Sequence, residues 1–155
     1  MNRKSYLTII LPMLLLLAVR VEAASDLRLA PNLSFTDDSS SNFPIVGKSL
    51  ADATTAGDRA TIMFFGTAHC WNTNREAERL VALYPKYQDR IDFVIVDVNN
   101  PAPAQQPLID KYYRGAIPTI AVIDSRGNVI YDRAGETAAT RGDTSKLQAL
   151  LDSAK

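Results

Sequence analysis

Apolar and polar residues recur along the chain with two periods, one typical of strands and one typical of helices. Mostly apolar runs rich in β-branched and aromatic residues, over 60–66 and 91–98, predict two buried strands. From Cys70 to about Tyr87, apolar residues recur at helical spacing among charged ones, which predicts an amphipathic helix. The same patterns predict short helices over 48–56 and 108–113, strands over 119–124 and 129–133, and a closing helix over 144–154.

The order of these elements predicts the fold class. The early strands alternate with helices, whereas the last two flank the turn residues Ser125-Arg126-Gly127-Asn128 and therefore form an antiparallel hairpin. Asp143 or Thr144 is expected to cap the closing helix. This order predicts an α/β domain whose mixed sheet is covered by helices on both faces.

The first residues have the parts of an export signal. Arg3 and Lys4 precede an apolar run over 7–19, and small residues follow up to Ala23. The apolar run is shorter than the roughly 20 residues that span a bilayer. We therefore expect residues 1–23 to be a signal peptide, cleavage after Ala23, no stable membrane insertion afterwards, and a secreted or periplasmic location.

The mature chain divides into two parts. Residues 24–44 are mostly polar, which predicts a tether that could add an edge strand, and residues 45–155 are predicted to form one domain. Residues 1–23 hold three basic residues and one acidic one, so their removal changes the formal net charge from 0 to −2. Because no basic run remains, we do not expect a nucleic-acid partner.

The chain has a single cysteine, Cys70, and so cannot form an internal disulfide. A lone thiol in an oxidising compartment must be buried, paired with another chain or used in chemistry. A metal site is not expected, because Cys70 beside His69 falls short of the three or four ligands that zinc requires. No cofactor is expected either.

Two motifs resemble those of the thioredoxin family. The first resembles the strand end, loop and Cys-x-x-Cys helix start of thioredoxins, and the second resembles their cis-proline loop. They read Phe65-Gly66-Thr67-Ala68-His69-Cys70-Trp71-Asn72-Thr73 and Gly115-Ala116-Ile117-Pro118-Thr119. The resemblance implies a thioredoxin fold with a central mixed sheet of four to five strands. It also implies that Pro118 is cis and packs against the sulfur, which leaves the backbone of Ile117 free to pair with an extended substrate.

The departures from the family limit the chemistry. Thr73 stands in the place of the second, resolving cysteine, and Phe64 stands where thioredoxins carry a buried aspartate. These departures exclude the intramolecular dithiol cycle. The exposed N–H groups of a helix start would still favour a thiolate at Cys70, which could form a mixed disulfide that an outside thiol resolves.

Three neighbours of Cys70 have both a functional and an ordinary interpretation. Thr73 could donate a hydrogen bond to the thiolate, or its hydroxyl could bond locally to the backbone. His69, if protonated, could favour the thiolate; in the ordinary interpretation it is a surface loop residue. Trp71 could present a platform beside the sulfur for a peptide, or cover the sheet edge.

Two main hypotheses for the function remain open. The first is monothiol thiol–disulfide exchange with exported protein thiols and disulfides or with glutathione. The second is a redox-inactive binding module that keeps the groove of the fold, in which Cys70 could also link two chains. A one-cysteine peroxidase is a minor alternative, because Thr67-Ala68-His69-Cys70 also fits Thr-x-x-Cys, although the prolines that peroxiredoxins place around this motif are replaced by Met63 and Trp71.

Overall fold

The computed structural model describes residues 25–55, 57–136 and 144–154. The predicted signal peptide, residues 1–23, lies outside these ranges, and so does Asp143, one of the two expected caps. Thr144, the other, is the first helical residue of the closing helix. No helix within the described ranges is both long and apolar enough to cross a bilayer.

A four-stranded mixed sheet forms the centre of the domain. Its strands lie in the order β4-β3-β5-β6; β3 and β4 are parallel, and the pairs β3–β5 and β5–β6 are antiparallel. The strands are β3 (Ala60–Gly66), β4 (Ile91–Asp97), β5 (Thr119–Ile123) and β6 (Val129–Ala134). The predicted α/β class, the mixed sheet and its hairpin are confirmed.

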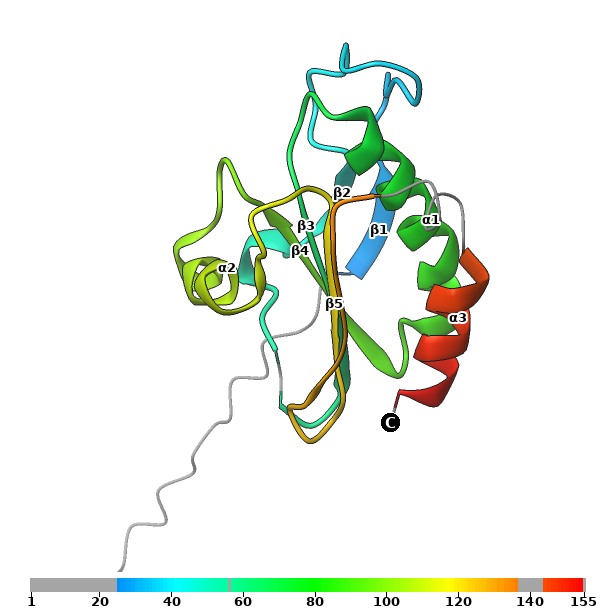
Figure 1. Ribbon diagram of the computed structural model, residues 1–155, viewed down its shortest axis with the longest axis vertical. Helices are drawn as coiled ribbons and strands as arrows, with labels where there is room; N and C mark the ends of the chain where they lie inside the picture. The colour runs from blue at the N-terminus through cyan, green and yellow to red at the C-terminus, as the bar shows by residue number, and fades with distance from the viewer. Residues whose placement is uncertain (1–24, 56, 137–143, 155) are drawn as a thin grey trace, which may run out of the picture.

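Helices cover both faces of this sheet, as expected (Figure 1). The helices α1 (Trp71–Tyr87) and α3 (Thr144–Ser153) lie on one face, and α2 (Gln106–Tyr112) lies on the other. Ile62 and Phe64 of β3 belong to the core beneath α1 and α3, whereas Met63 and Phe65 belong to the core beside α2. Successive side chains of a strand point to opposite faces of the sheet. Because a core covers each face, every residue of β3 is buried.

The predicted helix over 48–56 is wrong. In its place are the end of strand β2 (Ile45–Lys48) and one turn of 3₁₀ helix, η1 (Leu50–Asp52). Ser49 before this turn is left-handed, with φ of 55°, and Ala53 after it is extended. Neither conformation continues a helix, and a helix this short gains too little from its few hydrogen bonds to extend itself.

The N-terminal segment is packed on the domain rather than loose. Strand β1 (Ser25–Leu29) pairs with β2 in a separate two-stranded sheet, not at an edge of the central one. Leu27 and Ile45 of these strands are buried in the core shared with α1. The expectation of a polar tether over 24–44 is therefore corrected for its described part, because alternate apolar residues of β1 and β2 supply the buried surface that composition alone hides.

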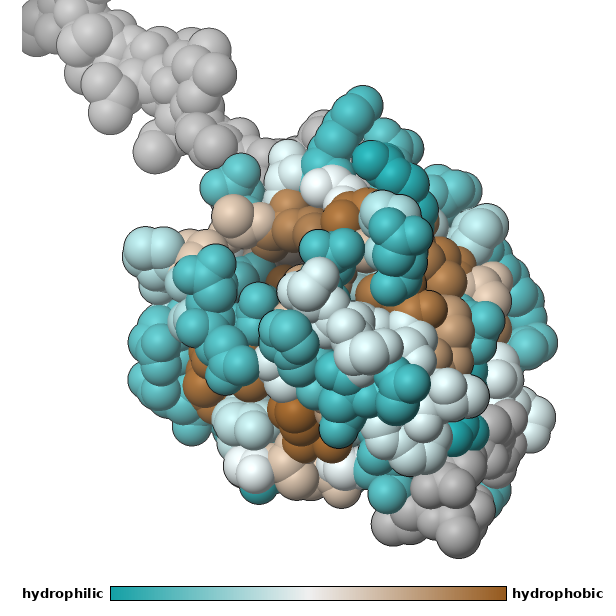
Figure 2. Space-filling model, turned by 90° about the horizontal axis from the view of Figure 1, so that it is seen from above, coloured by the Kyte–Doolittle hydropathy of each residue, from teal (hydrophilic) through white to brown (hydrophobic). Residues whose placement is uncertain are grey.

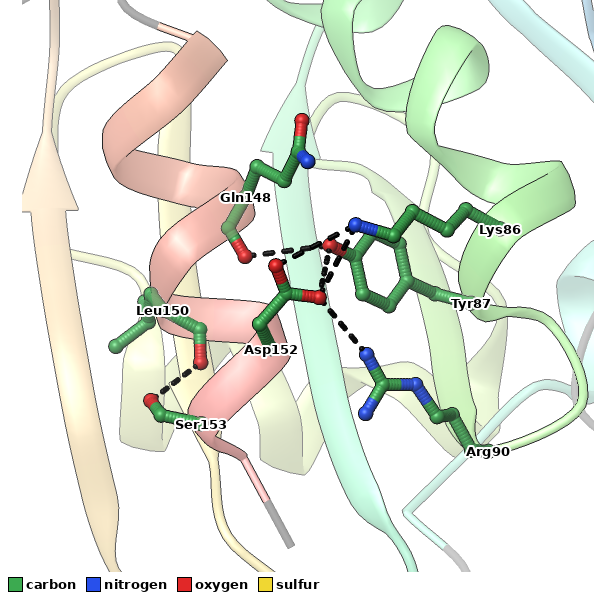
Figure 3. Close-up of polar contacts among 7 residues, drawn as sticks. All are labelled: Lys86, Tyr87, Arg90, Gln148, Leu150, Asp152 and Ser153. Carbon is green, nitrogen blue, oxygen red and sulfur yellow. Dashed lines mark hydrogen bonds and ion pairs between the residues drawn. The ribbon is translucent and has the colours of Figure 1, made fainter.

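The C-terminal ends of α1 and α3 are joined by polar contacts (Figure 3). The Tyr87 hydroxyl donates a hydrogen bond of 2.8 Å to the Asp152 carboxylate, and Lys86 and Arg90 lie 3.2 and 3.1 Å from the same oxygen. The hydroxyl and then the ammonium group lower the pKa of Asp152. These contacts fix α3 against α1 without a disulfide.

A buried cluster of charges joins α1 to β6. The Glu76 carboxylate accepts a hydrogen bond from the guanidinium of Arg79. It also forms an ion pair with the guanidinium of Arg133 at 2.6 Å. Arg79 donates a further hydrogen bond of 2.8 Å to the Glu136 carboxylate. The side chains of Glu76 and Glu136 are 3% and 0% exposed. Burial opposes the charge of Arg79, but the two carboxylates outweigh it and raise the pKa of this guanidinium. Glu76 is therefore the shared acceptor of the cluster.

Replacement of Glu76 should destabilise the fold strongly. Glu76→Ala leaves two guanidinium groups buried with one carboxylate, a loss that costs about 3–5 kcal/mol in comparable buried pairs. The exposed residue Glu78 on the same helix provides the control, since Glu78→Ala should change the free energy of unfolding by less than about 0.5 kcal/mol. Urea unfolding measures both; equal effects would contradict the role assigned to the buried cluster.

The hairpin between β5 and β6 depends on Asp124. Its carboxylate accepts hydrogen bonds of 2.9 Å from the backbone amides of Arg126 and Asn128. Hydrogen bonds from Asn128, and then those from Arg126, lower the pKa of Asp124 from 3.8 to about 2. The ionised carboxylate therefore stabilises the folded state.

The contribution of Asp124 should disappear in acid. Because its folded pKa is depressed, the stabilisation is present above pH 3.8 and is lost as the pH falls towards about 2. We expect Asp124→Asn to lower the urea midpoint at neutral pH and to differ progressively less from the wild type below about pH 4. A difference between the two proteins that stays constant down to about pH 2 would rule out this role.

Candidate active site

Cys70 lies at the point where the central strand gives way to the first long helix. β3 ends at Gly66, and Cys70 is the N-cap of α1, with an extended backbone at φ −145° and ψ 105°. Gly66 is required there, because a Cβ at this position would lie 2.5 Å from Cγ2 of Thr73. The thiol is free and partly exposed.

The Ile117-Pro118 peptide bond is at the same edge of the sheet as Cys70. Phe65 near the end of β3 pairs with Thr119 at the start of β5, so the segments that follow and precede these residues are neighbours. The bond is cis, as the resemblance implied. Pro118 is buried and its carbonyl accepts a hydrogen bond of 2.8 Å from Gly135. Ile117 is partly exposed, and its backbone has no hydrogen-bond partner among the described residues.

The amides at the start of α1 are open toward the N-cap position. Asn74 donates to the carbonyl oxygen of Cys70 at 3.0 Å, but the amides of Asn72 and Thr73 have no acceptor in the described part of the chain. An N-cap side chain is the group that normally accepts from these second and third amides. The Cys70 side chain makes no such bond. A thiolate at Cys70 would therefore have two backbone donors available.

Thr73 is fully buried, and its hydroxyl has no hydrogen-bond partner among the described residues. The predicted hydrogen bond from Thr73 to Cys70 is therefore absent from the structure. Its methyl group points toward Gly66 at the end of β3. The position of the usual second cysteine is thus filled by a packed side chain.

The other predicted site residues are partly accessible. His69 is exposed and left-handed, with φ of 55°. Trp71 is partly exposed, and the guanidinium of Arg75 lies 5.2 Å from its ring centroid. Phe64 is fully buried and contacts the ring of Phe43 edge-on, with centroids 6.3 Å apart. The place of the thioredoxin aspartate is therefore apolar.

A segment that the sequence did not reveal as part of the site lies against the helix start. We call residues 34–40 the strap. The Asp38 carboxylate accepts a hydrogen bond of 2.9 Å from the amide of Trp71, and the carbonyl of Ser40 accepts one of 3.0 Å from the amide of His69. The strap thus bonds to the residues on both sides of Cys70.

Asn74 holds the strap in place from within the helix. This buried side chain donates to the carbonyl of Ser34 at 2.6 Å and to the hydroxyl of Ser40 at 2.9 Å. The Ser40 hydroxyl also accepts from the amide of Ser34 at 2.6 Å. The one available sequence signal was Asn74 itself, since a polar residue on the buried side of a helix needs a partner.

The end of the molecule that carries the strap has a mixed surface. Figure 2 views the top of Figure 1, where this N-terminal loop and the start of α1 lie, and shows hydrophobic areas between hydrophilic ones. Among the described residues there is no group of three or more histidine, cysteine, aspartate or glutamate side chains that could hold a metal ion.

Comparison with solved structures gives the fold. Thioredoxin O1 from Arabidopsis thaliana matches with a TM-score of 0.50 and 21% identity, over 68% of this chain and 84% of that one. Thioredoxin O2 from the same plant matches with a TM-score of 0.49 and 20% identity, over 67% and 79%. The chain has the thioredoxin fold. The family resemblance predicted from the two motifs is confirmed at the level of the fold.

The thioredoxin fold does not by itself assign a reaction to this protein. The germline-specific thioredoxin Deadhead from Drosophila melanogaster also matches, with a TM-score of 0.47 and 18% identity over 61% of this chain and 80% of that one. No family model matches the sequence, and no curated protein is similar to it. The chemistry must therefore be argued from the residues around Cys70.

Removal of the buried hydroxyl of Thr73 should leave the reactivity of Cys70 unchanged. An unpaired buried hydroxyl costs about 1–3 kcal/mol, so Thr73→Val should unfold at an equal or higher urea concentration than the wild type. The rate of Cys70 alkylation by iodoacetamide should stay within about twofold of the wild-type rate. A several-fold slower alkylation would restore Thr73 as the hydrogen-bond donor to the thiolate.

Proposed function

We propose that this protein is an exported monothiol exchange protein that acts on disulfides through Cys70 alone. The observation that carries the proposal is the position of Cys70, a free and partly exposed thiol at the N-cap of α1. It lies beside the amides of Asn72 and Thr73, which have no acceptor among the described residues. These donors, with the positive end of the helix dipole, stabilise a thiolate more than a thiol.

The reaction has two exchange steps. In the first, the Cys70 thiolate attacks one sulfur of a substrate disulfide, so that a Cys70–substrate disulfide forms and the other substrate sulfur leaves as a thiolate. In the second, an external thiolate of the glutathione class attacks the substrate sulfur, so that a disulfide forms between the external thiol and the substrate while the Cys70–substrate disulfide breaks and Cys70 leaves as a thiolate. The external thiol must supply the second step, because Thr73 and Phe64 provide neither a resolving sulfur nor a proton acceptor.

The substrates that suit this site are extended segments of exported proteins, or glutathione disulfide. The backbone of Ile117 next to cis-Pro118 is available to hydrogen-bond an extended chain. Trp71, half-exposed beside Cys70, offers an apolar surface to such a chain. The predicted signal over 1–23 supports a secreted or periplasmic location for the exchange.

A binding module without turnover is the second candidate. One contact favours it: the amide of Trp71 already donates to the Asp38 carboxylate. That amide is therefore not available to stabilise a negative charge on Cys70. In that case the surface beside Pro118 would bind a partner, and Cys70 would capture it covalently at most once.

Glutathione-dependent reduction of insulin separates the two candidates. The full mature chain should accelerate the reduction, and Cys70→Ser should reduce the rate to that of glutathione alone, because no other cysteine exists. Glu78→Ala, an exposed change on α1, should retain the wild-type rate. Equal rates for the wild type and Cys70→Ser would leave the binding module as the function.

A further inference from the structure

The strap brings a carboxylate to the helix start that carries Cys70. Asp38 Oδ1 accepts from the first amide of α1, that of Trp71, at 2.9 Å. The two residues are 33 positions apart, so this contact is tertiary and not a local turn. Asp38 therefore acts as a second cap, adjacent to the N-cap residue Cys70.

Asp38 and a thiolate at Cys70 would both be anions at the start of α1, since Asp38 accepts from its first amide and Cys70 is its N-cap. The unpaired amides of a helix start amount to roughly half a positive elementary charge. A first anion there is stabilised, but a second anion close by is opposed by the first, and like charges disfavour ionisation.

We infer that Asp38 is a positioning residue that restrains the thiolate of Cys70 and so slows its exchange chemistry. The inference rests on the proposed function, to which it adds a control. Asp38 itself takes no part in bond making: its carboxylate, held at the helix start by the amide of Trp71, opposes negative charge on the sulfur that acts as the nucleophile.

The surroundings of Asp38 show that its position is fixed by the fold. The buried Asn74 side chain binds the strap at Ser34 and Ser40, on both sides of Asp38. The neighbouring carboxylate, that of Asp37, accepts from the amide of Ser39 at 3.0 Å and closes a turn within the strap. Of these two adjacent carboxylates, Asp38 bonds to α1, whereas Asp37 accepts within the strap.

Other charged groups lie near this helix start and set the background. His69 is exposed in the loop before Cys70, and Arg75 is placed over the ring of Trp71 on the first turns of α1. Both would favour a thiolate when they are positively charged. Asp37 and Asp38 of the strap are negatively charged. Because Asp38 accepts from α1 and Asp37 accepts within the strap, replacement of Asp37 serves as the control for replacement of Asp38.

Alkylation of the folded, full mature chain by iodoacetamide tests the inference. The thiolate sulfur of Cys70 bonds to the methylene carbon of iodoacetamide and iodide leaves, so at equal access the rate rises with the amount of thiolate. Asp38→Asn keeps an oxygen that accepts from Trp71 but removes the charge, and should raise the rate at neutral pH about three- to tenfold. Asp37→Asn should stay within about twofold of the wild type.

Two further readouts separate charge from a change of access. Asp38→Glu restores the charge and should return the rate toward that of the wild type. The ratio of the Asp38→Asn rate to the wild-type rate should shrink as salt is raised to about 1 M, because salt screens exposed charges. An Asp38→Asn rate equal to the wild type, an Asp38→Glu rate equal to that of Asp38→Asn, or a ratio independent of salt would each overturn the inference.

The outcome is distinguishable from failure of the proposed function. Alkylation measures the state of the thiol whether or not the protein exchanges disulfides. If insulin reduction does not depend on Cys70 but Asp38→Asn still alkylates faster, then the restraint holds and the exchange activity does not. If insulin reduction depends on Cys70 but Asp38→Asn is alkylated at the wild-type rate, then the proposed function holds and the restraint by Asp38 does not.

Discussion

The start of α1 is the constraint on which the site depends. A helix leaves its first amides without internal partners, and the side chains nearby decide what satisfies them. In this protein Asp38 accepts from the amide of Trp71, while the amides of Asn72 and Thr73 beside Cys70 have no acceptor in the part of the chain that the structure describes. We propose that the reactivity of the chain's one cysteine depends on how this helix start shares its amide donors between the Asp38 carboxylate and the Cys70 sulfur.

The rest of the fold holds that helix start in place. β3, fully buried on both faces, ends directly before the loop that carries Cys70, and its pairing with β5 brings the cis Ile117-Pro118 bond to the same edge. Without a disulfide, α1 is fixed by the core beneath it and by buried charges centred on Glu76. The position of α1 matters because a small shift of its first turn would move the amides of Asn72 and Thr73 relative to Cys70. The same shift would change the hydrogen bond from Trp71 to Asp38.

The sequence predicted the elements that depend on periodicity and missed those that depend on distant hydrogen bonds. The strands β3 and β4, the helix α1 and the final hairpin follow from patterns within a few residues. The strap does not, because its bonds to Trp71 and Asn74 join residues 33 to 40 positions apart. Composition made this segment look like a tether, whereas a few polar contacts and the buried side chain of Ser40 fix it.

The site residues show the same division. The motifs correctly placed Cys70 at a helix start and Pro118 in a cis peptide bond. Spacing also placed Thr73 near Cys70, but spacing fixes a position and not a side-chain rotamer. The hydroxyl of Thr73 is buried with no hydrogen-bond partner among the described residues. The direction of that side chain follows from packing against Gly66, which only the folded structure reveals.

The most direct test of the central claim is intact-mass measurement of the folded mature chain after incubation with glutathione disulfide. The account predicts one glutathione adduct per chain, located on Cys70, which reduced glutathione then removes to return the free thiol. An absence of adduct on the folded chain, under conditions in which the urea-unfolded chain acquires one, would contradict the account. In that case Cys70 would be a capped structural residue rather than an exchanging thiol.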